Sequence, residues 1–163
     1  MVEETLITQV PIPVENVHRM PTEYAPLQVA EEYEKVLRET FSLSADEPRP
    51  HFDLILLGLG EDGHTASLFP NTVGLHEEKR LVVADYVDKV QAWRVTLTPP
   101  VLNHAAHVVF LVSGPEKAAV VKEVLQGPTQ PERLPAQLVQ PEDGTLLWLV
   151  DKAAAALLES DRG

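Results

Sequence analysis

Apolar residues recur at helical spacing along residues 26–41, and charged residues fill most positions between them. This pattern predicts an amphipathic helix. Residues 52–57 form a short, nearly continuous apolar run, which is typical of a parallel strand covered on both faces. A weaker helical pattern over residues 1–10 is cut off by Pro11 and Pro13.

Strand and helix patterns alternate along the rest of the chain. Strands are predicted at residues 81–84, 93–97, 108–112 and 146–149, and helices at residues 116–125 and 152–159, the second opened by Asp151 as N-cap. This alternation predicts an α/β fold with an open, mainly parallel sheet and helices on both faces, a Rossmann-like three-layer arrangement. The length of 163 residues and the lack of a linker predict a single domain over residues 1–163.

The charge balance limits the partners that this chain can have. Its 25 Asp and Glu against 13 Lys and Arg give a formal net charge of −12, which disfavours nucleic acid and anionic membranes. There is no run of ~18 apolar residues and no signal-peptide pattern, so we expect a cytoplasmic protein.

No cysteine is present. The histidines lack metal-site spacing, so we expect no metal, and we expect His104 and His107 to pack or cap.

A glycine-rich turn follows the predicted strand at residues 52–57. Its glycines fit the G-x-G-x-x-G pattern of dinucleotide sites at Gly58, Gly60 and Gly63. Asp85 stands where such a site needs an acidic residue, but only residues 64–69 can be helical before Pro70, too few for the crossover helix of ~10 to 12 residues. The pattern therefore disfavours a dinucleotide and predicts another ligand at the carboxyl end of the strand.

Asp62 and His64 flank Gly63 in this turn. A carboxylate and an imidazole in one crevice suit proton transfer at physiological pH, and the free N–H groups of a following helical turn would suit an oxyanion. The alternative is that Asp62 caps the short helix and that His64 is a surface residue. Spacing alone leaves both interpretations open.

The string GLGEDGHTASLFP at residues 58–70 closely resembles the signature loop of the 6-phosphogluconolactonases, which open 6-phosphogluconolactone in the pentose phosphate pathway. Other motifs of that family match in order: ETLITQVPIPVENV at residues 4–17, RVTLT and VLN within residues 94–103, Gly114 with Lys117-Ala118, Leu134-Pro135-Ala136, and Trp148 with Asp151 and Ala153 to Ala155. The related glucosamine-6-phosphate deaminases share the Gly-Asp-Gly-His turn. They carry an acidic residue a few positions on, where this chain has SLFP, so the lactonase is favoured.

The resemblance implies cofactor-free hydrolysis of 6-phospho-D-glucono-1,5-lactone, a sugar phosphate, to 6-phosphogluconate. His64 would be the general base or proton shuttle, and Asp62 would orient it or contact sugar hydroxyls. The amides from Gly60 to Thr65 would meet the oxyanion or the substrate, and Lys117 would bind the phosphate. Arg94 would be a second cation or a support of the loop. The full substrate-binding set is Gly58, Gly60, Gly63, Thr65, Arg94 and Lys117, with a solvated Lys117 and a structural ion pair of Arg94 as the alternatives.

Members of that family begin with a further segment that carries a strand, a Gly-Gly-Ser-Thr-type phosphate loop and an Asp-Glu-Arg motif, and this chain starts after it. A fold truncated in this way at the N-terminus would expose a sheet edge and an apolar face. We therefore expect a homo-oligomer or a second chain that covers the missing part. The alternative function is a non-catalytic or partner-dependent sugar-phosphate-binding module derived from this family.

Overall fold

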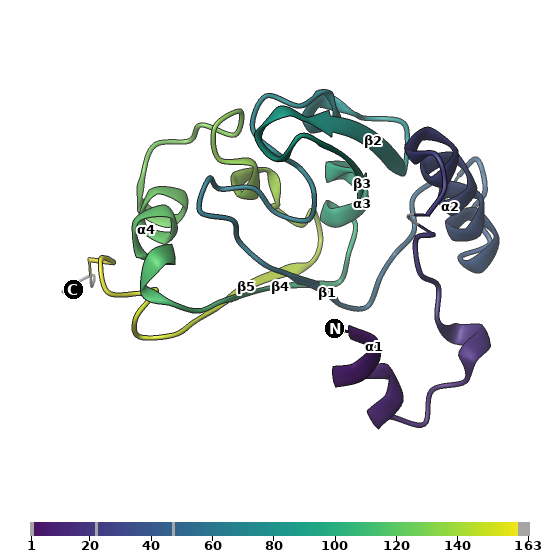
Figure 1. The fold of residues 1–163 in the computed structure, drawn as a ribbon, viewed down its shortest axis with the longest axis horizontal. Coiled ribbons are helices and arrows are strands. Elements are labelled where there is room, and N and C mark those ends of the chain that lie inside the picture. The colour runs from purple at the N-terminus through teal and green to yellow at the C-terminus, as the bar shows by residue number, and fades with distance from the viewer. Residues whose placement is uncertain (1, 22, 47, 160–163) are drawn as a thin grey trace.

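A computed structural model describes residues 2–21, 23–46 and 48–159 and divides their strands between two sheets (Figure 1). The first is parallel, with the order β1-β4-β5, and the second is the antiparallel hairpin β2-β3. The strands are β1 Ile55–Leu57, β2 Val82–Val87, β3 Ala92–Leu97, β4 His107–Val112 and β5 Thr145–Val150. The α-helices are α1 Val2–Thr5, α2 Pro26–Thr40, α3 Pro99–Asn103 and α4 Ala118–Gln126. An α/β fold with a parallel sheet is therefore confirmed.

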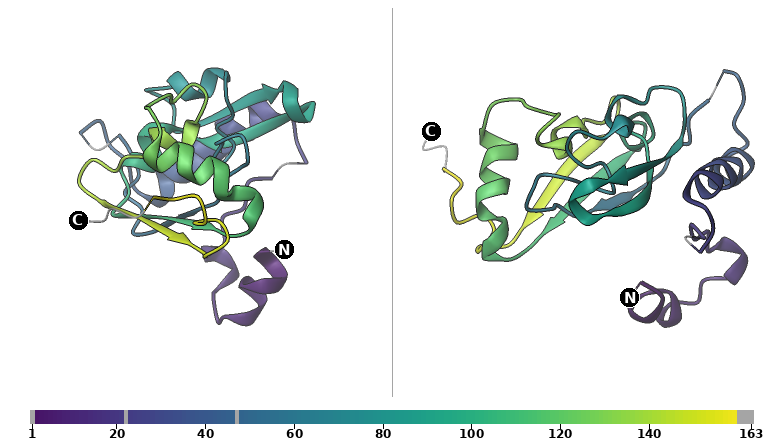
Figure 2. Two further views of the ribbon diagram at one scale, coloured as in Figure 1. Left: turned by 90° about the vertical axis from the view of Figure 1, so that its left-hand side faces the viewer. Right: turned by 45° about the horizontal axis from the view of Figure 1, so that its top comes forward.

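Helix α4 covers one face of the parallel sheet, and this packing makes the main core (Figures 1 and 2). Val121 of α4 and Val108 and Phe110 of β4 are fully buried. Phe110 stacks on Trp148 of β5 with ring centroids 3.9 Å apart, so the two strands are held together by side chains as well as by the ladder. The core fixes the carboxyl ends of β1 and β4 side by side.

The opposite face of the parallel sheet is open in the residues that the structure describes. Because side chains alternate along a strand, those next to the core residues point to the other face. Four leucines on that face are each about half exposed: Leu56 (57%), Leu111 (49%), Leu147 (49%) and Leu149 (50%). We expected helices on both faces, whereas α1, which contributes no buried side chain, and α2 leave these leucines uncovered.

Helix α2 packs against the hairpin instead of the parallel sheet. Ala30 and Leu37 of α2 share a core with Leu81 and Val82 at the start of β2. Within this contact Glu34 accepts hydrogen bonds from Arg38, from Arg80 and from the backbone N–H of Leu81. Burial alone would raise the pKa of Glu34, but these hydrogen bonds lower it below its ordinary value.

Some predicted elements differ in the structure. Strands β2 and β3 pair with each other, because the connection at residues 88–91 is a short turn and a parallel crossover needs about a dozen residues. The helix predicted at residues 152–159 is a series of turns over residues 152–157. Asp151 caps the first turn by accepting the Ala154 N–H, and its second oxygen accepts the Gly114 N–H.

No helix among the described residues has both the length and the apolar character needed to cross a membrane.

Candidate functional site

The glycine-rich segment, residues 58–70, leaves β1 at its carboxyl end and folds back on itself as a closed loop, here called the signature loop. The N–H of Gly60 donates to the carbonyl of His64 (2.8 Å), and the N–H of Gly63 donates to the carbonyl of Gly60 (2.9 Å). The Thr65 hydroxyl donates to the carbonyl of Gly58 (2.8 Å). These bonds hold the loop in one compact conformation.

The expected helical turn at residues 64–69 does not form. Thr65 and Leu68 make an isolated antiparallel bridge, and Ala66 between them has a φ of 49°. A residue in this left-handed region turns the chain back sharply and cannot continue an α-helix. Asp62 therefore caps no helix, and the donors that a helix start would offer to an oxyanion are absent here.

Two glycines are required by the shape of this loop. A Cβ on Gly60 would lie 2.0 Å from His64 Nδ1, so only glycine lets the imidazole lie against the backbone. Gly63 has a φ of 79°, and a Cβ there would lie 2.6 Å from Leu134 Cδ2. Gly60 thus makes room for the imidazole, and Gly63 makes room for the neighbouring Leu134-Pro135-Ala136 segment, whose Ala136 N–H donates to the Gly63 carbonyl.

Asp62 and His64 form a hydrogen-bonded pair within the loop. Asp62 Oδ1 lies 2.5 Å from His64 Nδ1, and Lys89 Nζ lies 2.5 Å from the other carboxylate oxygen, Oδ2. Burial would raise the pKa of Asp62, but the hydrogen bonds from Lys89 and His64 lower it to about 2. An ionised carboxylate only accepts hydrogen bonds, so Nδ1 of His64 carries the proton, and Nε2 is the basic nitrogen of the neutral ring.

The imidazole is also held from its flat side. The ring of Phe69, which is buried, stacks on His64 with centroids 4.0 Å apart and planes 19° apart. Asp62 and Phe69 therefore restrain the ring at its edge and at its face, while 28% of the His64 side chain stays accessible. Such a histidine is oriented before any ligand arrives.

A hollow of about 350 Å³, here called the His64 hollow, lies beside the loop. It is lined by Leu56, Leu57, Gly58, Leu59, Gly60, His64, Thr65, Ala66 and Lys117. Lys117 precedes α4 by one residue and is brought to the loop because β4, the strand before it, pairs with β1. The structure therefore brings together five of the predicted site residues: Gly58, Gly60, His64, Thr65 and Lys117.

Arg94 and the loop amides differ from the expectation. Arg94 is exposed in β3 opposite Asp85 and does not line the His64 hollow. The support that β3 gives to the loop comes from Thr96, whose hydroxyl accepts the Ser67 N–H. The N–H groups of Gly60, Gly63 and His64 all donate within the loop, which removes three of the expected oxyanion donors.

Lys89 is a site residue that sequence reasoning missed. It lies in the turn between β2 and β3, where Gln91 takes a left-handed φ of 49°. With Asp62, Phe69, Tyr86 and others it lines a second hollow of about 370 Å³, here called the Lys89 hollow. No motif joins Lys89 to Asp62 along the chain, because 27 positions separate them and only the placement of the hairpin brings them together.

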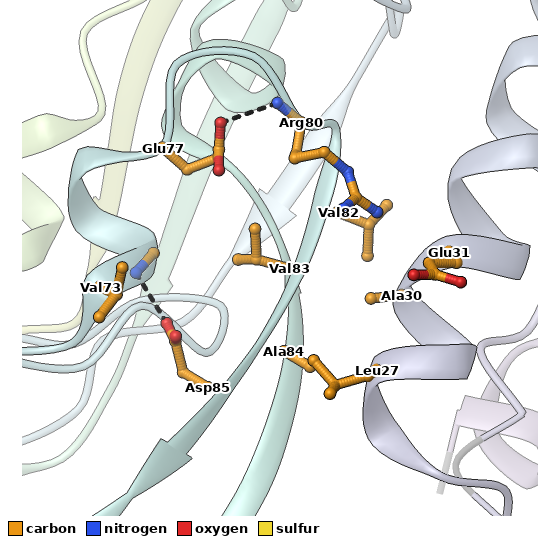
Figure 3. Close-up of a pocket in the computed structure, with 11 residues that line it drawn as sticks. Leu27, Ala30, Glu31, Val73, Glu77, Arg80, Val82, Val83, Ala84 and Asp85 are labelled. Carbon is orange, nitrogen blue, oxygen red and sulfur yellow. Dashed lines mark hydrogen bonds between the residues drawn. The ribbon is translucent and has the colours of Figure 1, made fainter.

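Asp85, the acidic residue considered for a dinucleotide ribose, serves another purpose. Its carboxylate accepts a hydrogen bond from the Gly74 N–H (2.9 Å) in a separate hollow of about 190 Å³ between α2 and β2 (Figure 3). Leu27 and Ala30 of α2 face Val82 and Ala84 of β2 there, while Val83 points to the other side, toward Val73. Asp85 thus fastens the residues after the signature loop to the hairpin and is not directed at the glycine turn.

The other histidines that the sequence singled out contact backbone or hydroxyl oxygens. His104 Nδ1 lies 3.2 Å from the carbonyl of Pro50, and His107 Nδ1 lies 2.7 Å from the Thr145 hydroxyl. In the described parts of the chain, no group of three or more His, Asp or Glu side chains has the arrangement of a metal site. The chemistry of the site therefore centres on Asp62, His64 and the two lysines.

This sequence and this fold are similar to those of known proteins. The family of glucosamine-6-phosphate isomerases and 6-phosphogluconolactonases matches residues 1–148. A 6-phosphogluconolactonase of Synechocystis is 45% identical over 149 residues, which are 91% of this chain and 60% of that protein. The chain thus spans about 60% of the length of that curated relative.

Two solved structures are similar to this chain in their fold as well as in their sequence. The crystal structure of the devB protein matches with a TM-score of 0.85 and 32% identity over 96% of this chain and 65% of that chain. The 6-phosphogluconolactonase of Trypanosoma brucei matches with a TM-score of 0.75 and 30% identity over 96% of this chain and 66% of that one. Almost the whole of this chain therefore has a counterpart in both.

Proposed function

Since this chain belongs to the family of glucosamine-6-phosphate isomerases and 6-phosphogluconolactonases, we propose that its signature loop hydrolyses 6-phospho-D-glucono-1,5-lactone to 6-phosphogluconate. The observation that carries this proposal is the Asp62–His64 pair beside a hollow that also contains Lys117. A base and a cation on the wall of one hollow match a substrate that has a reactive ester at one end and a phosphate at the other.

In the proposed reaction His64 is the general base. Its Nε2 takes a proton from a water molecule as the water oxygen bonds to the lactone carbonyl carbon. The resulting tetrahedral intermediate collapses by breaking the bond to the ring oxygen, and the protonated imidazole returns its proton to that oxygen. Asp62 keeps the Nδ1–H of His64 in place throughout and stabilises the positive charge that the ring carries between these steps.

Lys117 is the proposed phosphate-binding cation. It lies at the start of α4, where a lysine charge and the positive end of the helix act on an anion together. Gly58 also lines the hollow, but nothing lies within 4 Å of the position that a Cβ would take there, so an alanine would fit at this position. Arg94, which the structure leaves outside the His64 hollow, has no part in this proposal.

A second candidate function is favoured by one observation, the open leucine face of the parallel sheet. A parallel sheet is normally covered on both sides, so this face fits a chain that works with a second copy or with another polypeptide. In that case the chain is a sugar-phosphate-binding module that is inactive alone and depends on its partner. Such a module would bind 6-phosphogluconate without catalysing hydrolysis.

The decisive experiment follows the formation of 6-phosphogluconate from freshly prepared lactone, with spontaneous hydrolysis subtracted. We expect turnover by the chain, its loss in His64→Ala, and no change in His76→Ala. His76 is a matched control because it is an exposed histidine paired with Glu132 and does not line the His64 hollow. Turnover that survives in His64→Ala would exclude the proposed base, and binding without turnover would favour the module.

A pH series with the same assay tests the proton role of His64. Asp62 stays ionised well below neutrality, because its pKa is about 2. Asp62 therefore does not cause a change in turnover between pH 8 and pH 5, and we expect turnover to fall with the pH because a general base must be unprotonated. A flat profile over this range would contradict a histidine base.

A further inference from the structure

Lys89 reaches the catalytic pair from outside the signature loop and contacts its carboxylate directly. Its Nζ lies 2.5 Å from Asp62 Oδ2, while Asp62 Oδ1 holds His64 Nδ1. The three groups therefore form a chain that runs from the hairpin turn to the imidazole. Because Lys89 lines the Lys89 hollow and does not line the His64 hollow, it touches the pair from the far side of the carboxylate.

We infer that Lys89 is a positioning residue that fixes the Asp62 carboxylate and, through it, the orientation of the His64 imidazole. This inference rests on the proposed function for its catalytic consequence. Among the described residues, the bonds that Asp62 would keep without Lys89 are those to its own loop, to the N–H and Nδ1 of His64. The Asp62 carboxylate is held in one orientation because both of its oxygens are bonded, one to Lys89 and one to His64. The fixed carboxylate then fixes the orientation of the His64 ring.

The surroundings of Asp62 single out Lys89 for this role. The ionisable side chains that share the Lys89 hollow with Asp62 are Lys89, Asp88 and Tyr86, all from the hairpin. Lys89 is the only cation among these three, and the loop itself contributes His64 and the neighbouring Glu61. The Asp62 side chain is 16% accessible, so most of its surface is in contact with protein.

The geometry of the hairpin turn explains how Lys89 stays next to Asp62. The hairpin turn at Asp88–Val90 ends at Gln91, whose side chain donates to the Asp88 carbonyl (2.7 Å) and whose backbone N–H does the same. The turn is therefore closed by its own hydrogen bonds, and the flexible part of Lys89 is confined to its side chain. The Lys89 side chain remains 61% accessible, which leaves room for arginine at this position.

The test compares Lys89→Met, Lys89→Arg and Lys35→Met with the unchanged chain. Lys35 is a matched control because it is 62% accessible and pairs with a carboxylate, Glu32, on α2 (2.9 Å). We expect Lys89→Met to lower kcat about tenfold at constant KM, and Lys89→Arg to restore most of it. Lys35→Met should leave both constants unchanged. A rise in KM at constant kcat would overturn the inference, because it would make Lys89 a substrate-binding residue.

A second measurement does not depend on turnover. Carbon-13 NMR of labelled aspartate should show the pKa of Asp62 rising from about 2 toward 3.8 in Lys89→Met and remaining low in Lys89→Arg and Lys35→Met. An Asp62 pKa unchanged by Lys89→Met would overturn the inference. If the unchanged chain has no lactonase activity, the proposed function fails, and this titration alone decides whether Lys89 fixes Asp62. Where there is activity, an unchanged kcat in Lys89→Met would also overturn the inference.

Discussion

Gly60 lies so close to His64 that a Cβ on the glycine would be 2.0 Å from the ring nitrogen Nδ1. The same nitrogen bonds to Asp62, whose Oδ1 would lie 2.7 Å from that Cβ. The close approach therefore requires a glycine at position 60, because the Asp62–His64 pair occupies the volume that any other residue would need.

Gly60→Ala tests this relationship. We expect the imidazole to be displaced and the pair with Asp62 broken, so turnover of the lactone should fall at least tenfold, since misplacement by about 1 Å can cost a factor of roughly 100. The measurement is kcat together with the free energy of unfolding. Gly58→Ala is the control, because open space surrounds its Cβ position. Equal activities of the two variants would contradict the close-packing interpretation.

The stability that Asp62 contributes should depend on pH. Its folded pKa of about 2 lies below the ordinary value of 3.8, so the unfolded chain takes up a proton first as the pH falls. The contribution is complete above pH 3.8 and is lost as the pH falls through about 2. We therefore expect the difference in unfolding free energy between the unchanged chain and Asp62→Asn to shrink from pH 5 to pH 2. A difference that stays constant over this range would contradict the lowered pKa.

Glu34 joins α2 to the hairpin, and its removal should destabilise the fold. Glu34→Ala leaves the Leu81 N–H and the guanidinium groups of Arg38 and Arg80 without their acceptor. We expect a loss of about 2 kcal/mol in urea unfolding. Glu32→Ala is the matched control on the same helix, because the exposed pair with Lys35 should contribute less than about 1 kcal/mol. Similar losses in both variants would show that the Glu34 contacts contribute little.

The open leucine face predicts association in solution. We expect light scattering at micromolar concentration to give a dimer or a larger species, because exposed apolar faces of this kind are normally covered. Leu111→Lys and Leu147→Lys should shift the chain toward a monomer, since these neighbouring strands carry half-exposed leucines. Leu125→Lys on α4, a leucine that is 40% exposed away from this face, is the control. A clean monomer of the unchanged chain would contradict the expected oligomer.

Local patterns were sufficient for the elements whose formation depends on their own residues. The apolar spacing over residues 26–41 predicted α2 within one residue of its observed end, and the predicted runs overlap the cores of all five strands. Local sequence patterns predicted the secondary structure less well where contacts with distant residues compete with helix formation. Residues 152–157 form turns, and Glu159 bonds to Lys122 and Gln126 of α4, contacts that lie outside the local helix pattern.

By itself the sequence determined the α/β class, the place of the glycine turn after β1, and the adjacency of Asp62 and His64, because each depends on neighbours along the chain. The positions of the distant cations relative to that pair depend on the tertiary structure. Strand pairing carries Lys117 to the His64 hollow, and the hairpin carries Lys89 to Asp62 while Arg94 stays outside. The helical and strand periods of a sequence show which face of its own element a residue occupies. They do not show which faces of different elements pack together, because the free energy of that packing depends on the contacts of the whole core.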